Sequence, residues 1–158
     1  MRAAPFAVTL FVISIAATAP ISGANSVPFK GSWSGVTVSA DLATFPVVQI
    51  VADGDGQLTH LGRYFMTSPH TTDVTTGETI GDQIFTAANG DTLTAFCAGF
   101  ALPDATGIVT GGLDCNITGG TGRFEDATGT YVFFIHASPD PNGPGFVTEA
   151  TIDGEISF

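Results

Sequence analysis

The last thirteen residues of the chain, 146–158, alternate between two kinds of side chain. One set is largely apolar and consists of Phe146, Thr148, Ala150, Ile152, Gly154, Ile156 and Phe158. The residues between them are largely polar and include Glu149, Asp153 and Glu155. A period of two places the first set on one face of a β-strand and the second on the other. This segment is therefore predicted to be a strand with one face in a core and the other in water.

The same pattern recurs along the chain in short runs that turn residues separate. Glycine and threonine are abundant, whereas Leu, Glu, Lys and Arg, which favour helices, are scarce. Eight strands are predicted, at 29–41, 45–52, 57–68, 78–87, 91–102, 108–118, 128–137 and 146–158. Turns are expected at 53–56, 89–90 and 139–145. Such sequential hairpins favour an all-β fold, a single eight-stranded antiparallel barrel that is mostly up-and-down.

The first 24 residues have the features of an export signal. Arg2 supplies a positive start, 6–19 is apolar but too short to span a bilayer, and Ser22-Gly23-Ala24 offers small residues for cleavage. We expect a signal peptide over 1–24 that is cleaved after Ala24, a β-barrel domain over 25–158, and a secreted or periplasmic location. No later segment has the apolar length of a transmembrane helix, so no membrane span is expected.

The predicted mature chain is strongly acidic. Removal of Arg2 changes the formal net charge from −11 to −12. Such a surface repels phosphate backbones and anionic membranes, so nucleic acid is not an expected partner. The ordinary interpretation of this charge is solubility.

Cys97 and Cys115 are the only cysteines, and two cysteines in an exported protein predict one disulfide. A turn signal at 104–107 lies midway between them, which places them opposite each other on adjacent antiparallel strands. Closing this loop would stabilise the fold by about 3 kcal/mol. A metal-binding or catalytic pair is less favoured, because there is no Cys-x-x-Cys and no histidine at ligand spacing. Neither a metal nor a cofactor is expected.

A glycine-rich turn, Gly119-Gly120-Thr121-Gly122-Arg123-Phe124, separates two of the predicted strands. A phosphate-binding loop would need Lys-Ser/Thr after its last glycine and then a helix, and here Arg123-Phe124 and a strand follow. A dinucleotide-binding fingerprint fails for the same reason. We interpret the segment as a turn whose glycines adopt angles closed to other residues, with Phe124 packed into the end of the barrel.

Seven residues of this region match the pattern Gly-Gly-Thr-Gly-x-Phe-x-x-Ala-x-Gly: Gly119, Gly120, Thr121, Gly122, Phe124, Ala127 and Gly129. The match resembles the signature of the allene oxide cyclase and dirigent barrel superfamily. Segments 59–63 and 85–91 are similar to those of secreted bacterial members. The resemblance implies an eight-stranded barrel. In the plant cyclases a carboxylate and an ordered water close a cation in an apolar cavity, and dirigent proteins steer radical coupling. Their catalytic positions have no counterpart that we can align outside the turn.

His60 and Tyr64 share one face of the predicted strand 57–68 with Leu58 and Met66. We expect them to be polar groups inside the barrel and, with Glu78, the candidate catalytic residues. The alternative for His60 is a structural residue held by hydrogen bonds. A metal site of His60, His70 and His136 is not favoured, because they lie on different runs.

Three other segments have ordinary interpretations. The Asp-Gly-Asp-Gly sequence at 53–56 resembles the start of a calcium loop, but its twelfth position is Tyr64 rather than a glutamate, so an acidic turn is expected. Asn116-Ile117-Thr118 is a glycosylation sequon that matters only in a eukaryotic host. The run 131–135 is apolar on both faces and should need cover from a loop or an oligomer partner.

These observations favour a secreted, disulfide-stabilised small barrel that binds small apolar molecules without catalysis or serves as a structural module. The alternative is an isomerase or cyclase of the allene oxide cyclase type. An outer-membrane barrel is third, because the chain has too few Tyr and Trp residues for aromatic girdles. The expected partners are a small apolar ligand and a second copy of the chain.

Overall fold

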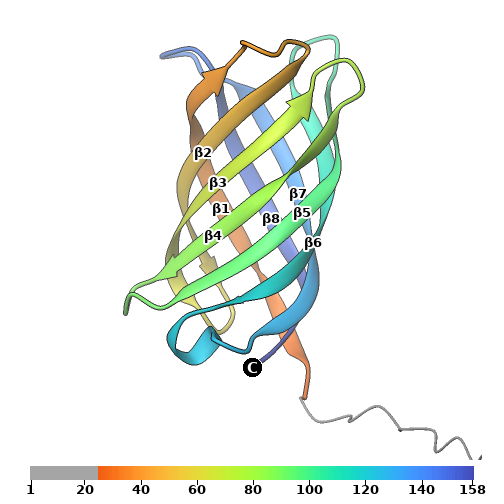
Figure 1. Cartoon of the computed structure of the whole chain (residues 1–158). Coiled ribbons are helices and arrows are strands. Elements are labelled where there is room, and N and C mark those ends of the chain that lie inside the picture. The colour runs from red at the N-terminus through yellow and green to blue at the C-terminus, as the bar shows by residue number, and fades with distance from the viewer. Residues whose placement is uncertain (1–24) are drawn as a thin grey trace, which may run out of the picture.

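The computed structural model describes residues 25–158 as one closed barrel (Figure 1). Its elements are β1 (Val27–Asp41), β2 (Val47–Leu58), β3 (Gly62–Asp73), β4 (Glu78–Ala87), β5 (Thr92–Pro103), β6 (Val109–Gly120), a 3-10 helix η1 (Gly122–Phe124), β7 (Thr128–Pro139) and β8 (Phe146–Ser157). Each strand pairs antiparallel with the next, and β8 pairs with β1. The predicted all-β, eight-stranded barrel is confirmed. The predicted signal peptide lies outside the described residues.

The alternation in β8 separates buried from exposed side chains, as the sequence predicted. Ala150, Ile152 and Ile156 are buried in the barrel, whereas Glu149 and Asp153 are exposed on its outer wall. The register with β1 runs without interruption from Val27 opposite Ile156 to Val36 opposite Val147. The first and last strands are thereby paired, and no sheet edge remains open in this barrel.

The expected acidic turn at 53–56 is wrong, because these residues lie within β2. The chain turns instead at 59–61, between β2 and β3. Gly56 faces Tyr64 across the two strands, and a methyl group at Gly56 would overlap the Tyr64 ring. The glycines of this segment therefore give space for close packing inside a strand, rather than freedom for a turn.

The glycine-rich turn closes the end of the barrel at which β1 begins and β8 ends (Figure 1). Gly122 has a φ of +58°, in the left-handed region that glycine adopts without strain, and begins η1. Phe124 is fully buried, as predicted, and its ring packs edge-on against Phe158 at 5.8 Å between centroids. The Arg123 guanidinium donates a hydrogen bond to the carbonyl of His60, which ties η1 to the β2–β3 turn.

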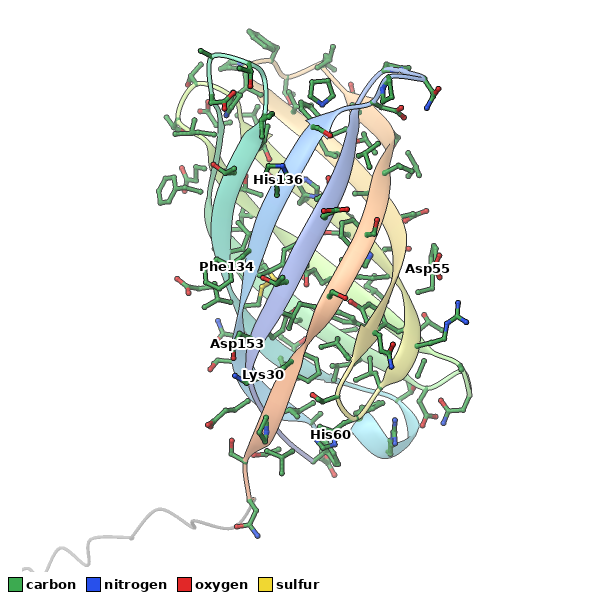
Figure 2. All side chains as sticks on the ribbon, turned by 180° about the vertical axis from the view of Figure 1, so that it is seen from behind. Lys30, Asp55, His60, Phe134, His136 and Asp153 are labelled. Atoms are coloured by element: carbon green, nitrogen blue, oxygen red, sulfur yellow. A yellow bond between two sulfur atoms is a disulfide. The ribbon has the colours of Figure 1, made fainter. Side chains whose placement is uncertain are left out.

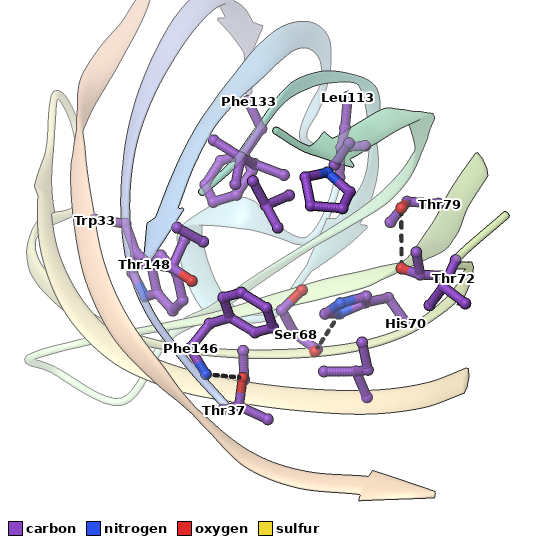
Figure 3. Close-up of a pocket in the computed structure, with 18 of the residues that line it drawn as sticks. Trp33, Thr37, Ser68, His70, Thr72, Thr79, Leu113, Phe133, Phe146 and Thr148 are labelled. Atoms are coloured by element: carbon purple, nitrogen blue, oxygen red, sulfur yellow. Dashed lines mark hydrogen bonds between the residues drawn. The ribbon is translucent and has the colours of Figure 1, made fainter. Parts of the chain in front are cut away.

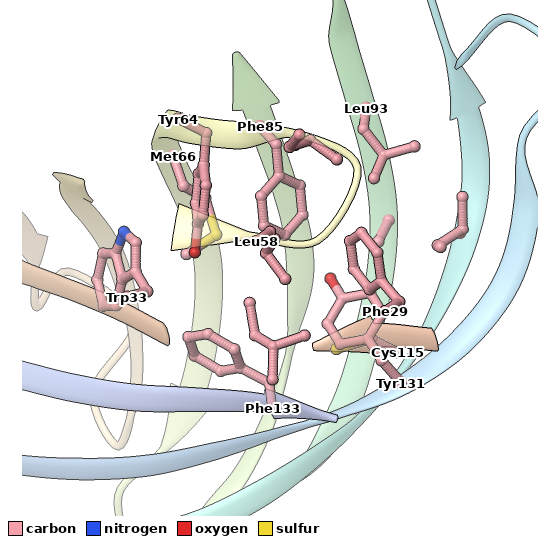
Figure 4. Packing of buried hydrophobic residues seen from close by; sticks show 14 of the residues in the cluster. Phe29, Trp33, Leu58, Tyr64, Met66, Phe85, Leu93, Cys115, Tyr131 and Phe133 are labelled. Carbon is pink, nitrogen blue, oxygen red and sulfur yellow. The ribbon is translucent and has the colours of Figure 1, made fainter. Parts of the chain in front are cut away.

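The interior between this end and the middle of the barrel is filled with large side chains (Figure 4). Phe29, Phe85 and Tyr131 pack together with centroid separations of 5.3 to 6.4 Å. Tyr64 joins the same group, 5.3 Å from Phe85. Gln83 lies among them with 1% of its surface exposed, and accepts a hydrogen bond of 2.7 Å from the Tyr131 hydroxyl. This half of the barrel is a packed core.

The predicted disulfide is present inside the barrel. Cys97 on β5 and Cys115 on β6 are register partners, are both buried, and are joined by a bond between their sulfur atoms. The turn between them is held by Asp104, whose carboxylate accepts hydrogen bonds from the backbone and hydroxyl of Thr106. The bridge spans 18 positions of sequence and covalently links two neighbouring strands of the wall.

Reduction of this disulfide should lower the free energy of unfolding by about 3 kcal/mol, because the unfolded chain regains the conformations that the closed loop forbids. Denaturant unfolding with and without a thiol reductant measures the difference. A Cys97→Ala/Cys115→Ala variant serves as the control, since the reductant should leave its unfolding unchanged. Equal stabilities of the oxidised and reduced protein would contradict the prediction.

Candidate functional site

The end of the barrel opposite η1 contains a cavity of about 210 Å³ (Figure 3). It is lined from β1 by Trp33 and Thr37, from β2 by Ile50 and Ala52, from β3 by Met66, Ser68, His70 and Thr72, from the β3–β4 turn by Val74, from β4 by Thr79, from β5 by Ala101 and Pro103, from β6 by Val109 and Leu113, from β7 by Phe133, Ile135 and Ala137, and from β8 by Phe146 and Thr148. Most of these side chains are apolar, and none carries a carboxylate, an ammonium or a guanidinium group.

The cavity exists because the inward positions of this end carry smaller side chains. Ala101, Ala137 and Thr79 stand at inward positions here, where the opposite half of the barrel has Phe29 and Phe85. A barrel of eight strands has an interior just wide enough to be filled by large side chains, so small ones leave space for a ligand. The Trp33 and Phe133 rings, 5.9 Å apart, lie between the cavity and the packed core.

His70 is the one side chain of the cavity wall that titrates near neutral pH. Its Nδ1 lies 2.9 Å from the backbone carbonyl oxygen of Ser68. Burial lowers the pKa of the imidazole, and the hydrogen bond to Ser68 only partly opposes this effect. The ring is therefore neutral at pH 7. Because a carbonyl oxygen can only accept, Nδ1 carries the proton and donates it to Ser68.

Several hydroxyl groups of the wall already have partners within the protein. Thr72 and Thr79 are hydrogen-bonded through their side-chain oxygens at 2.9 Å, and Thr79 donates to the carbonyl of Gly77 at 3.2 Å. The Thr37 hydroxyl accepts from the backbone N–H of Phe146 at 3.2 Å. Ser68 differs from them, because its hydroxyl has no hydrogen-bond partner among residues 25–158. It is thus left for a ligand or for water.

The structure does not bring the three candidate catalytic residues together. Tyr64 does point inward, as expected, and its hydroxyl donates to the Ser32 carbonyl at 3.0 Å; burial raises its pKa. The expected inward position of His60 is wrong, because the residue lies exposed in the β2–β3 turn with a φ of +66° (Figure 2). Glu78 is exposed at the start of β4, opposite Phe100.

His70 and Ser68 are the cavity residues that the sequence analysis missed as site residues. The predicted third strand ended at 68, whereas β3 continues to Asp73. Extension of the same alternation would have placed Tyr64, Met66, Ser68, His70 and Thr72 on one inward face. The three histidines also lie apart, because His136 is exposed on the outer side of β7 (Figure 2). Within residues 25–158 no three His, Cys, Asp or Glu side chains are grouped as metal ligands are.

The outer wall carries both charged and apolar side chains (Figure 2). Lys30 on β1 and Asp153 on β8 form an exposed ion pair of 2.8 Å. Phe100 and Phe134 are exposed by 61% and 51%, and both are register partners of Gly112. Among the described residues no loop covers Phe134, so the cover expected for the run 131–135 is not supplied by a loop.

No protein-family model matches the sequence, and no curated protein matches it. Among solved structures, the chain is similar to a pterocarpan synthase dirigent protein, with 13% sequence identity, a TM-score of 0.47, and coverage of 85% of this chain and 86% of that one. The closed eight-stranded barrel that the glycine turn led us to expect is confirmed by the strand order of this chain. The likeness concerns the fold alone.

The lowered pKa of His70 predicts a loss of stability in mild acid. Because the imidazole is harder to protonate in the folded protein, the unfolded chain, with a histidine pKa of about 6.5, binds more protons below that pH. The free energy of unfolding should therefore fall as the pH is lowered from 7.5 through 6.5 toward the pKa of the folded state. Asp73 and Asp104, whose pKa values are lowered by hydrogen bonds from Thr75 and Thr106, lose their contribution only in stronger acid.

Denaturant unfolding at several pH values measures this loss, and a His70→Gln variant is the control. The variant should show a smaller decrease between pH 7.5 and pH 5.5 than the unmodified protein. Parallel curves for the two proteins would show that His70 does not resist protonation in the fold.

Proposed function

We propose that this protein is an exported, disulfide-stabilised barrel that binds a small apolar molecule in the cavity without transforming it. The observation that carries the proposal is the contrast between the two halves of one barrel. Large side chains pack the half on the η1 side of Trp33, and the other half contains the apolar cavity. Concave, mostly apolar sites with a few placed polar groups are the usual form of small-molecule sites. His70 and Ser68 are such groups here.

The size of the cavity limits the ligand. Drug-sized ligands occupy pockets of about 300–1,000 Å³, and a cavity of about 150 Å³ is large enough for benzene. A space of about 210 Å³ suits a molecule with one ring and a short substituent, or a short aliphatic chain. A larger ligand would have to extend past the barrel mouth.

An isomerase or cyclase is the less favoured function. The cyclases of the resembling superfamily use a carboxylate beside the reacting atoms. The cavity wall offers the imidazole of His70 as its acid–base group but holds no carboxylate, and Glu78 lies on the outer side of β4. The catalytic roles of His60, Tyr64 and Glu78 remain a prediction, and unchanged turnover of a candidate substrate by a variant lacking all three would eliminate those roles.

Export is supported by the disulfide. A buried disulfide between two wall strands is typical of proteins that fold in an oxidising compartment. No helix within residues 25–158 is long and apolar enough to cross a membrane. An outer-membrane barrel would need an apolar band around its whole outer wall, which the exposed Asp55, Glu149 and Asp153 interrupt. Recovery of the protein in the extracytoplasmic fraction without detergent would support this location.

Binding can be measured through Trp33, which lines the cavity and is the only tryptophan of the chain. Titration with a small cyclic hydrocarbon should change the tryptophan emission in a saturable way. Ala101→Leu should weaken this binding at least about tenfold, because the added methyl and methylene groups occupy the space that the ligand fills, and each buried CH₂ contributes about 0.8 kcal/mol.

Ala98→Leu is the matched control, since Ala98 lies on the same strand but is exposed on the outer wall. This variant should bind as the unmodified protein does. Binding that both substitutions reduce equally, or the absence of a saturable change with any hydrocarbon of this size, would refute the cavity as the binding site.

Self-association stays a prediction. Phe100 and Phe134 flank Gly112 on the outer wall and are both exposed. We expect a second copy of the chain to pack on this surface, because large contiguous apolar patches mark protein contacts. Light scattering after size-exclusion chromatography should give a mass above that of one chain, and Phe100→Ser/Phe134→Ser should reduce it to one chain. A monomer at all concentrations would contradict the prediction.

A further inference from the structure

Two side chains on the inward face of β3, His70 and Ser68, carry polar groups of different kinds that have no partner among residues 25–158. The Thr148 hydroxyl of the wall also has none, and the Trp33 indole N–H has none but is enclosed by protein atoms. His70 is neutral and donates its Nδ1 proton to the Ser68 carbonyl, so its Nε2 holds a lone pair. Among residues 25–158 no group hydrogen-bonds Nε2, and Nε2 is not enclosed by protein atoms. The imidazole therefore offers the cavity an acceptor. The Ser68 hydroxyl, two positions away on the same inward face of β3, offers a donor (Figure 3).

We propose that the ligand is an apolar alcohol, whose hydroxyl group donates to Nε2 of His70 and accepts from the hydroxyl of Ser68. The inference rests on the proposed function and specifies the chemistry of its ligand. A hydroxyl group both donates and accepts, so one small group satisfies both partners. The rest of the wall, including Trp33, Leu113 and Phe133, would contact the hydrocarbon part.

Other polar ligands fit these two groups less well. A carboxylate would meet no cation in the cavity wall, and its oxygens would face the lone pair of His70. An ammonium ion would find no carboxylate there. A ketone could accept from Ser68 but would leave Nε2 unpaired, and a buried polar group without a partner weakens binding. Asp41 lines a groove that His70 also borders, but the two residues form no ion pair that would hold the imidazole charged.

The test compares three ligands of nearly the same shape: cyclohexylmethanol, ethylcyclohexane and cyclohexanecarboxylate. The hydrocarbon leaves water more readily than the alcohol does, whatever the site contains. The informative quantity is therefore the ratio of the two dissociation constants, alcohol to hydrocarbon, and how this ratio changes when His70 is substituted. Dissociation constants are read from Trp33 emission at pH 7.5. His70→Phe should shift this ratio at least about tenfold against the alcohol, since the acceptor is lost.

Three further variants separate the hydrogen bonds from general effects on the fold. His70→Gln keeps an acceptor oxygen and should restore much of the preference for the alcohol. Ser68→Ala should shift the ratio in the same direction as His70→Phe. His136→Phe replaces an exposed histidine on the outer wall and should leave the ratio unchanged. The carboxylate should bind weakest to the unmodified protein.

The outcomes distinguish the two proposals. If none of the three ligands binds, the proposed function fails and the present inference fails with it. If the hydrocarbon and the alcohol both bind but His70→Phe shifts their ratio less than about twofold, the binding function stands and the alcohol assignment is overturned. Tighter binding of the carboxylate than of the alcohol would also overturn it.

The tautomer can be read independently of any ligand. Long-range proton–nitrogen NMR spectra of the imidazole should show a protonated Nδ1 and a bare Nε2 in the free protein at pH 7.5. Cyclohexylmethanol should move the Nε2 resonance, and ethylcyclohexane should not. A proton on Nε2 in the free protein would overturn the assignment of this nitrogen as the acceptor.

Discussion

The pairing of β1 with β8 is the constraint on which the other features of this protein depend. Once the sheet is closed with eight strands, the width of its interior is set, and only the size of the inward side chains decides whether it is filled. Phe29 and Phe85 fill the half nearest η1, whereas Ala101 and Ala137 leave space in the other half. The cavity is therefore a consequence of side-chain volume within a uniform wall.

The end of the barrel that carries η1 is closed by packed side chains. Phe124 and Phe158 pack against each other at the end where η1 lies, and the Arg123 side chain of η1 donates a hydrogen bond to the carbonyl of His60. The disulfide joins β5 to β6 between this packed end and the cavity, and it restrains two strands that contribute to both regions. The cavity lies at the opposite end, where the connections β1–β2, β3–β4, β5–β6 and β7–β8 lie (Figure 1).

Alternation predicted the barrel because a half-buried strand imposes a period of two, which the sequence displays directly. The same argument failed at 53–56, where glycines were interpreted as turn residues although Gly56 is needed for the Tyr64 ring inside the wall. The cavity was missed for a related reason. At a barrel mouth the inward positions, such as His70 and Thr72, are polar or small, so the alternation fades where the strand continues. Sequence patterns detect packed faces better than hollow ones.

The tautomer of His70 could not be predicted from the sequence, because it depends on a hydrogen bond to the backbone of its own strand. Burial keeps the imidazole neutral, and the Ser68 carbonyl then fixes which nitrogen holds the proton. The charge of the chain acts at longer range. Because the chain has many more acidic than basic residues, it repels anions before they reach the mouth of the barrel. If the cavity binds a ligand as proposed, two features would disfavour an anionic one: the acidic chain repels it at long range, and the cavity wall holds no cation.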